Sequence, residues 1–575
     1  MRTALVSKFH KALVVPRSLG MERLFPEAKP LNEKQLVLKH GLAEYTLLRR
    51  LGFAVPNPIN CYYNWAEGNP YHVQRVTCSL LTASPRAYVL NDMGTGKTRA
   101  TLWAWDYLRG NGYCGKLLIV AKRSTLSLVW ANECRKVIPH RGFQVLYGSK
   151  KKRLERLADP DAELFIINHD GMKVIQDELD KRKDIDVLVI DELATYRNPN
   201  PRSKAIMKFA ERQKFVWGLT GSPMPNEPTD VWMQCRIITP HTVPKYRSHA
   251  RDMLMIKRHE YHWDPKPDAV DRAYSWMQPA VRFSLADVVE LPEIVVRDIN
   301  VGMTLQQQKG YTDVKNLFIT KFQGQEVNAP NAAVAVNKLL QIAGGFVYGA
   351  DAQGKKTTIK LDSTPRVEVL IDLIQSASRK VLVFCPFRHM VMGLHEIMNG
   401  DPAKDPNYVE HAVIHGDVTD SQRNKIFDAF QNTAQYKAII AHPGTMAHGL
   451  TLTAADTVIW YCPYPNFETY EQANARIRRI GQAHRQQIFH LHGSSVERKI
   501  YSSLLKKEAV QDMLLTLFEE ATTLAQQGQP MEYSNVRPRE SHFVPSDLSG
   551  RSGETSGITG GVARKANKSP RRTSL

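Results

Sequence analysis

Residues 91–101 of the chain read "NDMGTGKTRAT". This stretch matches the phosphate-binding pattern G-x-x-x-x-G-K-[ST], except that Asn91 stands where the first glycine is expected. The apolar run "AYVL" (87–90) precedes it, and the helical pattern of "KTRATLWAWDYLRG" (97–110) follows. Strand, loop and helix in this order are the context in which the pattern binds a nucleotide. The stretch therefore predicts a nucleotide-binding α/β fold.

The loop residues indicate how a triphosphate would be held. Gly94 and Gly96 let backbone N–H groups converge on phosphate oxygens, and the helix N-terminus adds partial positive charge. Lys97 is placed for the β- and γ-phosphates, and Thr98 for Mg²⁺. Because Gly94 still supplies flexibility inside the turn, the missing first glycine is tolerable. The predicted nucleotide-contacting loop is Asn91, Asp92, Met93, Gly94, Thr95, Gly96, Lys97 and Thr98.

An acidic pair ends a later apolar run, "VLVIDELA" (187–194). Asp191 is predicted to bind Mg²⁺, and Glu192 to polarise the attacking water. Such a pair can also simply cap the next helix. The phosphate loop upstream favours the catalytic interpretation.

Short apolar runs separated by helical patterns come in two series. The first is 87–90, 116–121, 163–168, 186–191 and 215–220; the second is 381–385, 411–416, 437–441, 457–461 and 487–493. Strands that are apolar throughout and alternate with helices indicate parallel sheets covered on both faces. The sequence thus predicts an α/β protein with two lobes.

The expected organisation has six parts. They are an N-terminal extension with one helix at 32–52 (1–65), a first lobe (66–240), a helical linker or insertion (241–365), a second lobe (366–510), a C-terminal helix (511–526) and a disordered basic tail (527–575).

The composition indicates which class of partner and which cellular compartment to expect. The chain has 77 Lys and Arg against 57 Asp and Glu, a formal charge of +20 that favours a polyanionic partner such as nucleic acid. No apolar run is long enough to span a membrane, and the N-terminus has no signal-peptide pattern. Seven dispersed cysteines without a C-x-x-C pair fit a reducing compartment and no metal site. The expected location is cytoplasmic, or nuclear in a eukaryote.

Six motifs occur in the order known from one family. They are "DMGTGKT", "LLIVAKRSTLSLVWANE", "VLVIDELATYRNPNPRSK", "GLTGSPMPN", "HGLTLTAADTVIWYCPYPN" and "QANARIRRIGQ". Over roughly residues 70–510 the chain resembles the Swi/Snf-type DNA-dependent ATPases of helicase superfamily two, the DEAD/DEAH-like group. The resemblance implies two RecA-like lobes, ATP and Mg²⁺ as cofactors, and double-stranded DNA as partner.

The stretch "QANARIRRIGQ" (472–482) places Arg476 and Arg479 at i and i+3, on one face of a helix. If the second lobe closes on the first, both can reach the γ-phosphate as arginine fingers. The alternative is an ordinary basic helix surface.

Four more cofactor contacts are implied by the resemblance. Gln74 resembles the glutamine that reads adenine. Thr220 and Ser222 in "LTGSP" resemble the residues that relay the nucleotide state between lobes, although hydroxyls there also cap turns. Gly449 in "AHGLTL" resembles a glycine facing the cleft.

Nucleic-acid contacts are expected at strand ends. Lys122, Arg123 and Ser124 follow a strand of the first lobe, and Arg388 and Thr445 occupy corresponding places in the second. Basic and hydroxyl residues there suit phosphate contact that is independent of sequence. Taken alone, each of these residues is explained equally well as part of the solvated surface.

Several positions depart from the family pattern. Ala194 stands where relatives have His, Ala447 and Thr451 where Gly and Asn are usual, and Lys122 where Pro is expected. The short linker resembles stand-alone bacterial or bacteriophage members. The predicted function is ATP-driven movement along duplex DNA; the alternatives are a strand-separating helicase and a catalytically inactive DNA-binding scaffold.

Overall fold

The computed structural model describes most of the chain through residue 504. The described residues are 2–65, 68–224, 227–259, 263–317, 319–322, 325–328, 332–350, 356–446 and 451–504. The predicted C-terminal helix and basic tail lie outside them, as does Gly449.

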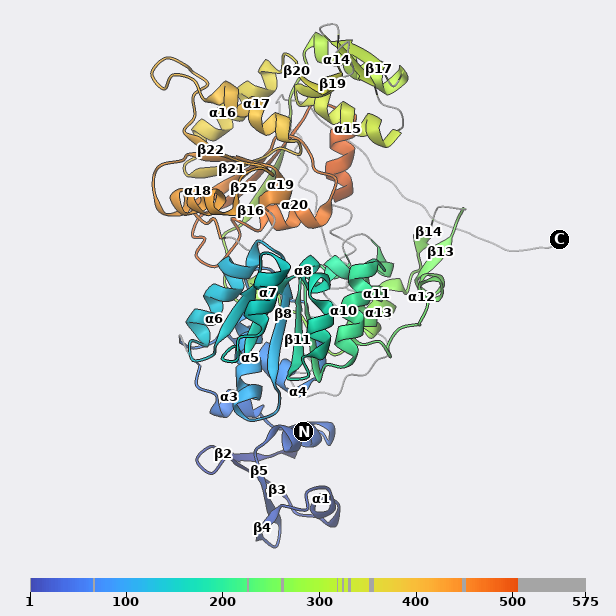
Figure 1. The fold of residues 1–575 in the computed structure, drawn as a ribbon, viewed down its shortest axis with the longest axis vertical. Helices are drawn as coiled ribbons and strands as arrows, with labels where there is room; N and C mark the ends of the chain where they lie inside the picture. The colour runs from blue at the N-terminus through green and yellow to red at the C-terminus, as the bar shows by residue number, and fades with distance from the viewer. Residues whose placement is uncertain are drawn as a thin grey trace, which may run out of the picture. The chain divides into compact units, whose positions relative to one another are not determined.

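The first lobe is built on a seven-stranded parallel sheet with the order β15-β7-β12-β11-β8-β10-β9 (Figure 1). Its strands are β7 (Arg86–Val89), β8 (Lys116–Ala121), β9 (Phe143–Leu146), β10 (Leu164–Asn168), β11 (Ile185–Asp191), β12 (Phe215–Leu219) and β15 (Ala280–Val281). Five of them confirm the first predicted series. The short edge strands β9 and β15 were not predicted.

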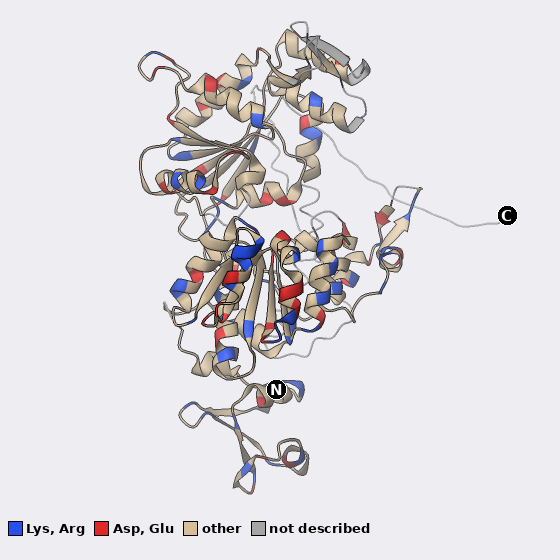
Figure 2. Cartoon of the chain, viewed as in Figure 1, with Lys and Arg blue, Asp and Glu red and all other residues tan. Residues whose placement is uncertain are grey.

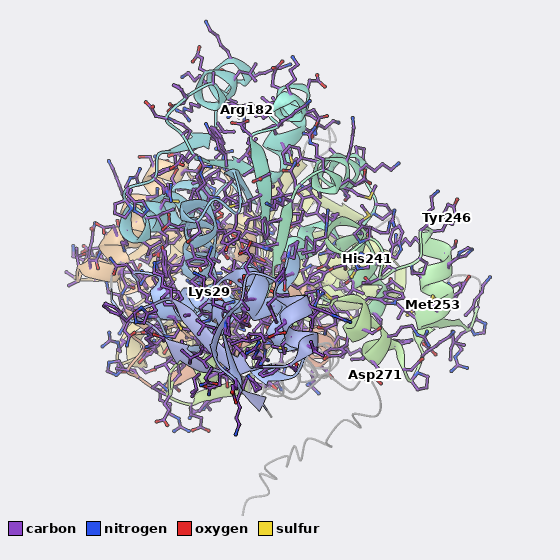
Figure 3. All side chains as sticks on the ribbon, turned by 90° about the horizontal axis from the view of Figure 1, so that it is seen from below. Lys29, Arg182, His241, Tyr246, Met253 and Asp271 are labelled. Atoms are coloured by element: carbon purple, nitrogen blue, oxygen red, sulfur yellow. The ribbon has the colours of Figure 1, made fainter. Side chains whose placement is uncertain are left out.

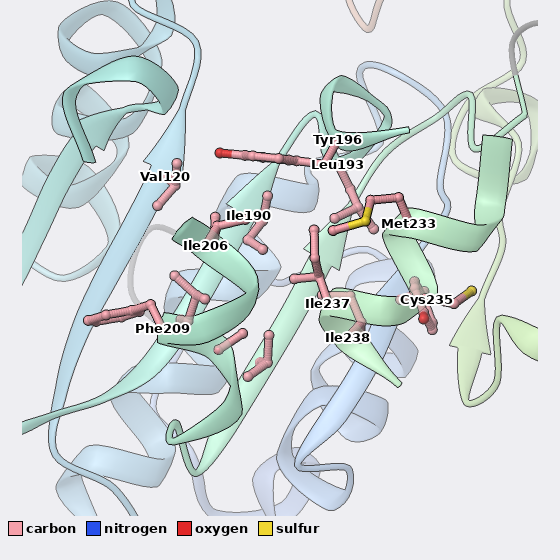
Figure 4. Close-up of a cluster of buried hydrophobic side chains, with 14 of the residues drawn as sticks. Val120, Ile190, Leu193, Tyr196, Ile206, Phe209, Met233, Cys235, Ile237 and Ile238 are labelled. Atoms are coloured by element: carbon pink, nitrogen blue, oxygen red, sulfur yellow. The ribbon is translucent and has the colours of Figure 1, made fainter. Parts of the chain in front are cut away.

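Alternate residues of these strands pack into two apolar layers, one on each face of the sheet. In β11, Leu188 and Ile190 belong to one layer, whereas Val187 and Val189 belong to the other. Figure 4 shows part of the first layer, in which Ile190 lies among side chains of the neighbouring helices. The helical segments are α4 (His72–Ala83), α5 (Lys97–Gly110), η1 (Leu126–Ala131), α6 (Asn132–Val137), α7 (Lys150–Leu157), α8 (His169–Val174), α9 (Gln176–Lys181), η2 (Leu193–Tyr196), α10 (Pro201–Glu211), η3 (Pro228–Asp230), α11 (Val231–Ile238) and α13 (Ala269–Trp276).

The second lobe has a six-stranded parallel sheet with the order β16-β25-β24-β21-β23-β22. Its strands are β16 (Ile294–Asn300), β21 (Lys380–Phe384), β22 (His411–Ile414), β23 (Ala438–Ala441), β24 (Ala455–Trp460) and β25 (Gln486–His492). Its helices are α16 (Thr364–Ser376), α17 (Arg388–Met398), α18 (Asp420–Asn432), α19 (Pro443–Met446) and α20 (Phe467–Asn474). All five runs of the second predicted series are strands here, so the two-lobed α/β fold is confirmed.

The region predicted as a helical linker, 241–365, is in part β-structure. Its strands β15 and β16 are edge strands of the two lobe sheets, and β16 pairs with β25 over seven residues. The rest comprises α12 (Arg247–Leu254), β13 (Met255–Lys257), β14 (Trp263–Pro265), η4 (Leu285–Asp287), α14 (Leu305–Leu317), β17 (Ile319–Phe322), β18 (Gln325–Asn328), α15 (Ala332–Ala343), β19 (Phe346–Ala350) and β20 (Lys356–Lys360). β17 to β20 form an antiparallel sheet of their own.

The N-terminal part was predicted to contain a single helix at 32–52, and this was wrong for its first half. Residues 35–39 form a strand, in which Leu36 and Leu38 are buried and their neighbours are not. That period of two matches a sheet with one buried face. The elements are β1 (Arg2–Thr3), β2 (Leu5–Ser7), β3 (Ala12–Pro16), α1 (Leu19–Leu24), β4 (Lys29–Asn32), β5 (Gln35–Lys39), α2 (Leu42–Arg50), β6 (Phe53–Ala54) and α3 (Pro58–Tyr62).

Candidate nucleotide site and nucleic-acid groove

Three neighbouring strands bring the predicted nucleotide residues together. β7, β12 and β11 are adjacent and parallel, so their carboxyl ends meet at one edge of the sheet. The loop 91–96 follows β7, Thr220 follows β12, and Asp191 ends β11. The Thr220 N–H donates to the Val89 carbonyl at 3.0 Å, which ties the end of β12 to the strand before the loop.

The loop has the backbone shape of a phosphate cradle. Gly94 and Gly96 have φ values of +89° and +83°, a left-handed conformation that favours glycine. The Lys97 ammonium donates to the Asn91 carbonyl at 2.6 Å and to the Asp92 carbonyl at 3.1 Å, inside the curve of its own loop. Burial lowers the pKa of Lys97, and the carboxylates of Glu192, Asp191 and Asp92 oppose that effect.

Asn91, which replaces the first glycine, is a buried structural residue. Its amide nitrogen donates to Thr77 Oγ1 at 3.0 Å, and its amide oxygen accepts from the Phe283 N–H at 3.0 Å. Asp92 adds an ion pair with Arg282 at 2.7 Å and accepts from the Leu285 N–H at 2.9 Å. The segment after β15 therefore braces the loop, so side-chain contacts fix a backbone that a glycine would leave mobile.

Gln74 lies directly against this loop. It is buried in the first turn of α4 and accepts a hydrogen bond from the Tyr71 N–H at 3.0 Å. A Cβ added to Gly96 would come within 2.1 Å of Gln74 Nε2, so Gly96 leaves the space that this amide occupies. The sequence placed Gln74 at the site only by resemblance, and the structure places it in contact with the loop.

The acidic pair has an unusual backbone. Glu192 has φ +53° and ψ +53°, a left-handed conformation that costs a non-glycine residue on the order of 1–3 kcal/mol. Asp191 Oδ1 accepts from the Glu192 N–H at 3.0 Å, and Oδ2 accepts from the Trp130 indole at 2.9 Å. Burial, with the neighbouring Glu192 carboxylate, raises the pKa of Asp191 to about 6, and the Trp130 bond and Lys97 oppose this.

Sequence reasoning missed Trp130. It is fully buried in η1, a single π-helical turn, and it orients the carboxylate from behind. A signal was available, because this tryptophan lies in the quoted stretch "LLIVAKRSTLSLVWANE" in an otherwise aliphatic run.

Replacing Trp130 with Phe is expected to raise the Mg²⁺ concentration needed for half-maximal ATP hydrolysis by about tenfold or more, because the carboxylate loses its orienting donor. A magnesium titration of the hydrolysis rate measures this. Trp103→Phe is the matched control, since the buried Trp103 indole N–H has no acceptor among the described residues. An unchanged magnesium requirement in Trp130→Phe would contradict the assignment.

Thr220 and Ser222 connect the first lobe to the second. Thr220 Oγ1 accepts from the Ser222 N–H at 3.2 Å, and the Ser222 hydroxyl donates to Glu471 of α20 at 2.5 Å. A Cβ added to Gly221 would lie 3.5 Å from the Asn91 carbonyl oxygen. The turn after β12 thus touches both the nucleotide loop and the helix that precedes the two arginines.

Arg476 and Arg479 were predicted on a helical face, and this was wrong. Helix α20 ends at Asn474, and the arginines follow in a turn and a bend, where the Arg476 carbonyl accepts from the Leu452 N–H at 3.0 Å. Both nevertheless lie at the loop. Arg476 Nη2 is 3.9 Å from Met93 Sδ, and a Cβ on Gly94 would be 3.7 Å from Arg479 Cγ.

These two guanidinium groups are poorly hydrated. Burial lowers the pKa of Arg479 to about 10, and burial followed by repulsion from Arg479 lowers that of Arg476. The Glu192 carboxylate opposes the shift in both. An anion placed between the two groups would stabilise their charged forms and raise both pKa values, as a site for a phosphate requires.

Four of the five predicted nucleic-acid contacts line two adjacent hollows, here together called the groove, whereas Arg388 lines neither of them. Lys122, Arg123 and Ser124 line a hollow of about 540 Å³ together with residues from the turn and helix after β22, and Thr445 lines an adjacent hollow with Arg123 and Ser124. The first hollow is lined by Lys122, Arg123, Ser124, Asn168, His169, Asp170, Thr195, Arg202, Gly416, Asp417, Val418, Thr419, Asp420 and Arg423. Both lobes contribute to it.

Acidic residues neutralise several of these cations. Arg123 pairs with Asp420 at 3.1 Å, and Arg388 pairs with Asp417 at 2.6 Å. Lys122 is turned toward Glu468 of α20 at 3.7 Å. The two arginine pairs are exposed, where ion pairs contribute roughly 0–1 kcal/mol, so phosphate groups can replace their carboxylates. The Lys122–Glu468 pair is largely buried. Figure 2 shows Lys and Arg spread over both lobes rather than gathered on one element.

His169 in this groove makes stability depend on pH. It is buried, its Nδ1 lies 2.9 Å from the Tyr196 hydroxyl, and burial lowers its pKa to about 3. Because the folded-state pKa is below the unfolded one, the protein loses stability as pH falls from about 6.5 toward 3.

Between pH 7 and pH 5, the free energy of unfolding of His169→Gln is expected to fall by about 2 kcal/mol less than that of wild type. The variant lacks the imidazole that is protonated in the unfolded chain but kept neutral by burial in the folded protein. Urea unfolding at both pH values measures this. His241→Gln, at an exposed position labelled in Figure 3, is the control. Equal losses in His169→Gln and wild type would contradict the account.

Two family matches agree with this geometry. Residues 77–344 match the SNF2-related domain, and residues 365–481 match the helicase conserved C-terminal domain. The chain therefore carries an SNF2-related domain followed by a helicase conserved C-terminal domain. The matched ranges contain every candidate site residue except Gln74, which lies three residues before the first of them.

Known proteins similar to this SNF2-related chain include a phage protein and larger ATPases. Putative protein p41 of Acyrthosiphon pisum secondary endosymbiont phage 1 is 24% identical over 469 residues, 78% of this chain and 98% of the relative. The ISWI chromatin-remodeling complex ATPase ISW1 of Saccharomyces cerevisiae is also 24% identical over 469 residues, 78% of this chain and 40% of the relative. The uncharacterized ATP-dependent helicase MG018 of Mycoplasma genitalium is 22% identical over 453 residues, 75% of this chain and 42% of the relative. The chain thus spans less than half the length of the latter two.

Among solved structures, a similar one is the Sulfolobus solfataricus SWI2/SNF2 ATPase core in complex with dsDNA. It has 20% sequence identity and a TM-score of 0.38, and the match covers 80% of this chain and 96% of that one. Within the described residues of the SNF2-related chain, no helix has the length and apolar character that crossing a membrane requires.

Proposed function

We propose that this SNF2-related protein is an ATP-dependent translocase on double-stranded DNA. The observation that carries the proposal is the approach of Arg476 and Arg479, from the second lobe, to the loop at Met93 and Gly94 in the first. A site built from two lobes can couple hydrolysis to relative movement of those lobes, whereas a site within one lobe cannot.

The residues present fit ATP with Mg²⁺. The left-handed Gly94 and Gly96 shape a cradle of backbone N–H groups, and the Lys97 ammonium already points into it. Thr98 and Asp191 would hold Mg²⁺, which supplies charge neutralisation on the phosphate oxygens when bound. Glu192 is proposed to orient the attacking water, and Gln74 to contact the adenine.

Closing and opening of the lobes would follow the nucleotide. The two arginines stabilise a triphosphate only when the lobes approach, so ATP favours the closed form, and loss of the γ-phosphate removes that preference. The Ser222–Glu471 hydrogen bond joins the lobes beside the loop and is placed to transmit the change.

The groove provides the proposed DNA track. Lys122, Arg123 and Ser124 line the groove from one lobe and Thr445 lines it from the other, where Arg388 pairs with Asp417 of the first hollow, so each lobe would supply its own phosphate contacts. If the two sets bind DNA phosphates alternately, each cycle of closing and opening moves the protein along the DNA backbone. Contacts to phosphate rather than to bases suit movement over any sequence.

The proposal is tested by measuring phosphate release in parallel with duplex DNA, single-stranded DNA, RNA and no nucleic acid. We expect the rate to rise most with duplex DNA. A rate indifferent to nucleic acid would overturn the proposal. Release of a strand from a fluorescent fork would favour strand separation instead, and no release of phosphate at all would favour an inactive scaffold.

A further inference from the structure

The N-terminal module, residues 1–63, is a compact basic unit. It carries ten Lys and Arg against four Glu and no Asp. Its strands β2-β3-β5-β4 form an antiparallel sheet (Figure 1), and buried residues such as Leu13, Leu36, Leu38 and Phe53 make up its own core. Lys29, labelled in Figure 3, is exposed on the edge strand β4 of this sheet.

The turn between β2 and β3, residues 8–11, presents an aromatic ring among basic side chains. Phe9 is 91% exposed although the core of the module is filled without it. Lys8, His10 and Lys11 are exposed beside it, and the His10 ring meets the Phe9 ring edge-on at 4.9 Å. In the part of the chain that the structure describes, no carboxylate lies within ion-pairing distance of Lys8 or Lys11.

This turn is held in place by the structure beneath it. Lys11 has a φ of +46°, and its carbonyl accepts from the His40 N–H at 2.8 Å. Its ammonium lies 5.6 Å from the centre of the Tyr62 ring, and the Tyr62 hydroxyl lies 2.7 Å from His40 Nδ1. The exposed ring is therefore presented by a fixed turn, which reduces the entropy lost on binding.

The same contacts connect the turn to the nucleotide-binding lobe. Tyr62 ends α3, and the residues at the start of α3 bond to α4. The Asn57 amide donates to the Ser79 carbonyl at 3.0 Å, and the Asn60 amide donates to Ser79 Oγ at 2.8 Å. Because α4 carries Gln74, the module is attached to the motor rather than tethered by a loose linker.

We propose that the turn 8–11 is a second nucleic-acid contact, which stacks Phe9 on an unpaired base while Lys8 and Lys11 bind the adjoining phosphates. Exposed aromatic rings among basic residues bind unpaired bases because every base has a face to stack on, whereas paired bases in a duplex keep theirs covered. The proposal deepens the proposed function, on which it rests: the track is DNA that includes a junction between duplex and single strand.

The test compares two DNAs that share one duplex, one blunt and one ending in a fork of unpaired strands. Fluorescence anisotropy of the full-length protein without nucleotide measures both affinities. Wild type is expected to prefer the fork, and Phe9→Ala to bind the fork roughly tenfold more weakly. Phe9→Trp is expected to retain the preference, because it keeps a stacking ring.

Matched controls separate stacking from general effects. Leu24→Ala removes another exposed apolar side chain of the module, and Lys34→Ala removes a positive charge from a different turn. Neither control is expected to change fork preference. Equal fork binding by Phe9→Ala and wild type would overturn the proposal, as would a loss in Leu24→Ala equal to that in Phe9→Ala. The proposal would also be overturned if the turn bound a partner protein and wild type showed no preference for the fork.

The two proposals fail in different measurements. Lys97→Ala, which the proposed function expects to stop hydrolysis, is expected to keep the fork preference. If DNA does not change the hydrolysis rate of wild type but Phe9 is needed for fork binding, the proposed translocase function is contradicted and the proposed contact at the turn 8–11 is not. If DNA stimulates hydrolysis but fork binding does not depend on Phe9, only the proposed contact at the turn is contradicted.

Discussion

Lys97→Ala is expected to reduce ATP hydrolysis by about a hundredfold or more, to the background of the assay. The ammonium is the positive charge inside the loop, where burial makes its interaction with phosphate oxygens strong. Phosphate release at saturating ATP and duplex DNA measures the loss. Glu192→Gln is expected to stop hydrolysis as well but to retain ATP binding, because only the water-orienting carboxylate is removed.

The control for charge removal is Lys116→Ala at the opposite end of the sheet, where Lys116 pairs with Asp184 at 3.6 Å. It is expected to hydrolyse ATP as wild type does. If Lys97→Ala turns over ATP at a rate near that of Lys116→Ala, the loop is not the catalytic nucleotide site.

Replacing Arg476 or Arg479 with Ala is expected to lower kcat by about a thousandfold with a much smaller effect on ATP affinity, because arginine fingers act mainly on the charge of the transition state. Single-turnover hydrolysis together with binding of a fluorescent ATP analogue separates the two effects.

The chain supplies its own control for this experiment. Arg478 lies between the two arginines and is exposed, and it lines a hollow with Asp92 and Met93 of the loop. Arg478→Ala therefore removes the same charge from the same turn and leaves Arg476 and Arg479 in place. A loss in Arg478→Ala equal to that in Arg476→Ala would show that the stretch matters for its charge or fold and not for its approach to the phosphate.

Much of the fold could be predicted because buried strands leave a strong local signal. The ten predicted strands are apolar over nearly their whole length, and the loop and the acidic pair stand at strand ends, whereas the two arginines follow helix α20. The structure adds edge strands that the sequence hides. β15 has two residues, and β16 is largely exposed, so neither has the apolar pattern of a central strand.

Long-range pairings could not be predicted for a related reason. Arg282 and Phe283 reach the loop only because β15 joins the edge of the first sheet beside β7, and nothing in their local sequence indicates it. The arginine turn fails the helix prediction because the Arg476 carbonyl bonds to the Leu452 N–H, a partner 24 residues away. Trp130 was visible in the sequence, but its partner Asp191 is found only through the sheet.

Movement along duplex DNA driven by ATP hydrolysis can be measured by displacement of a third strand from a triplex at one end of a long duplex. We expect the third strand to be released only with ATP, not to be released by Lys97→Ala, and to leave the two duplex strands paired. Steady ATP hydrolysis on the same DNA with the third strand still bound would contradict this expectation.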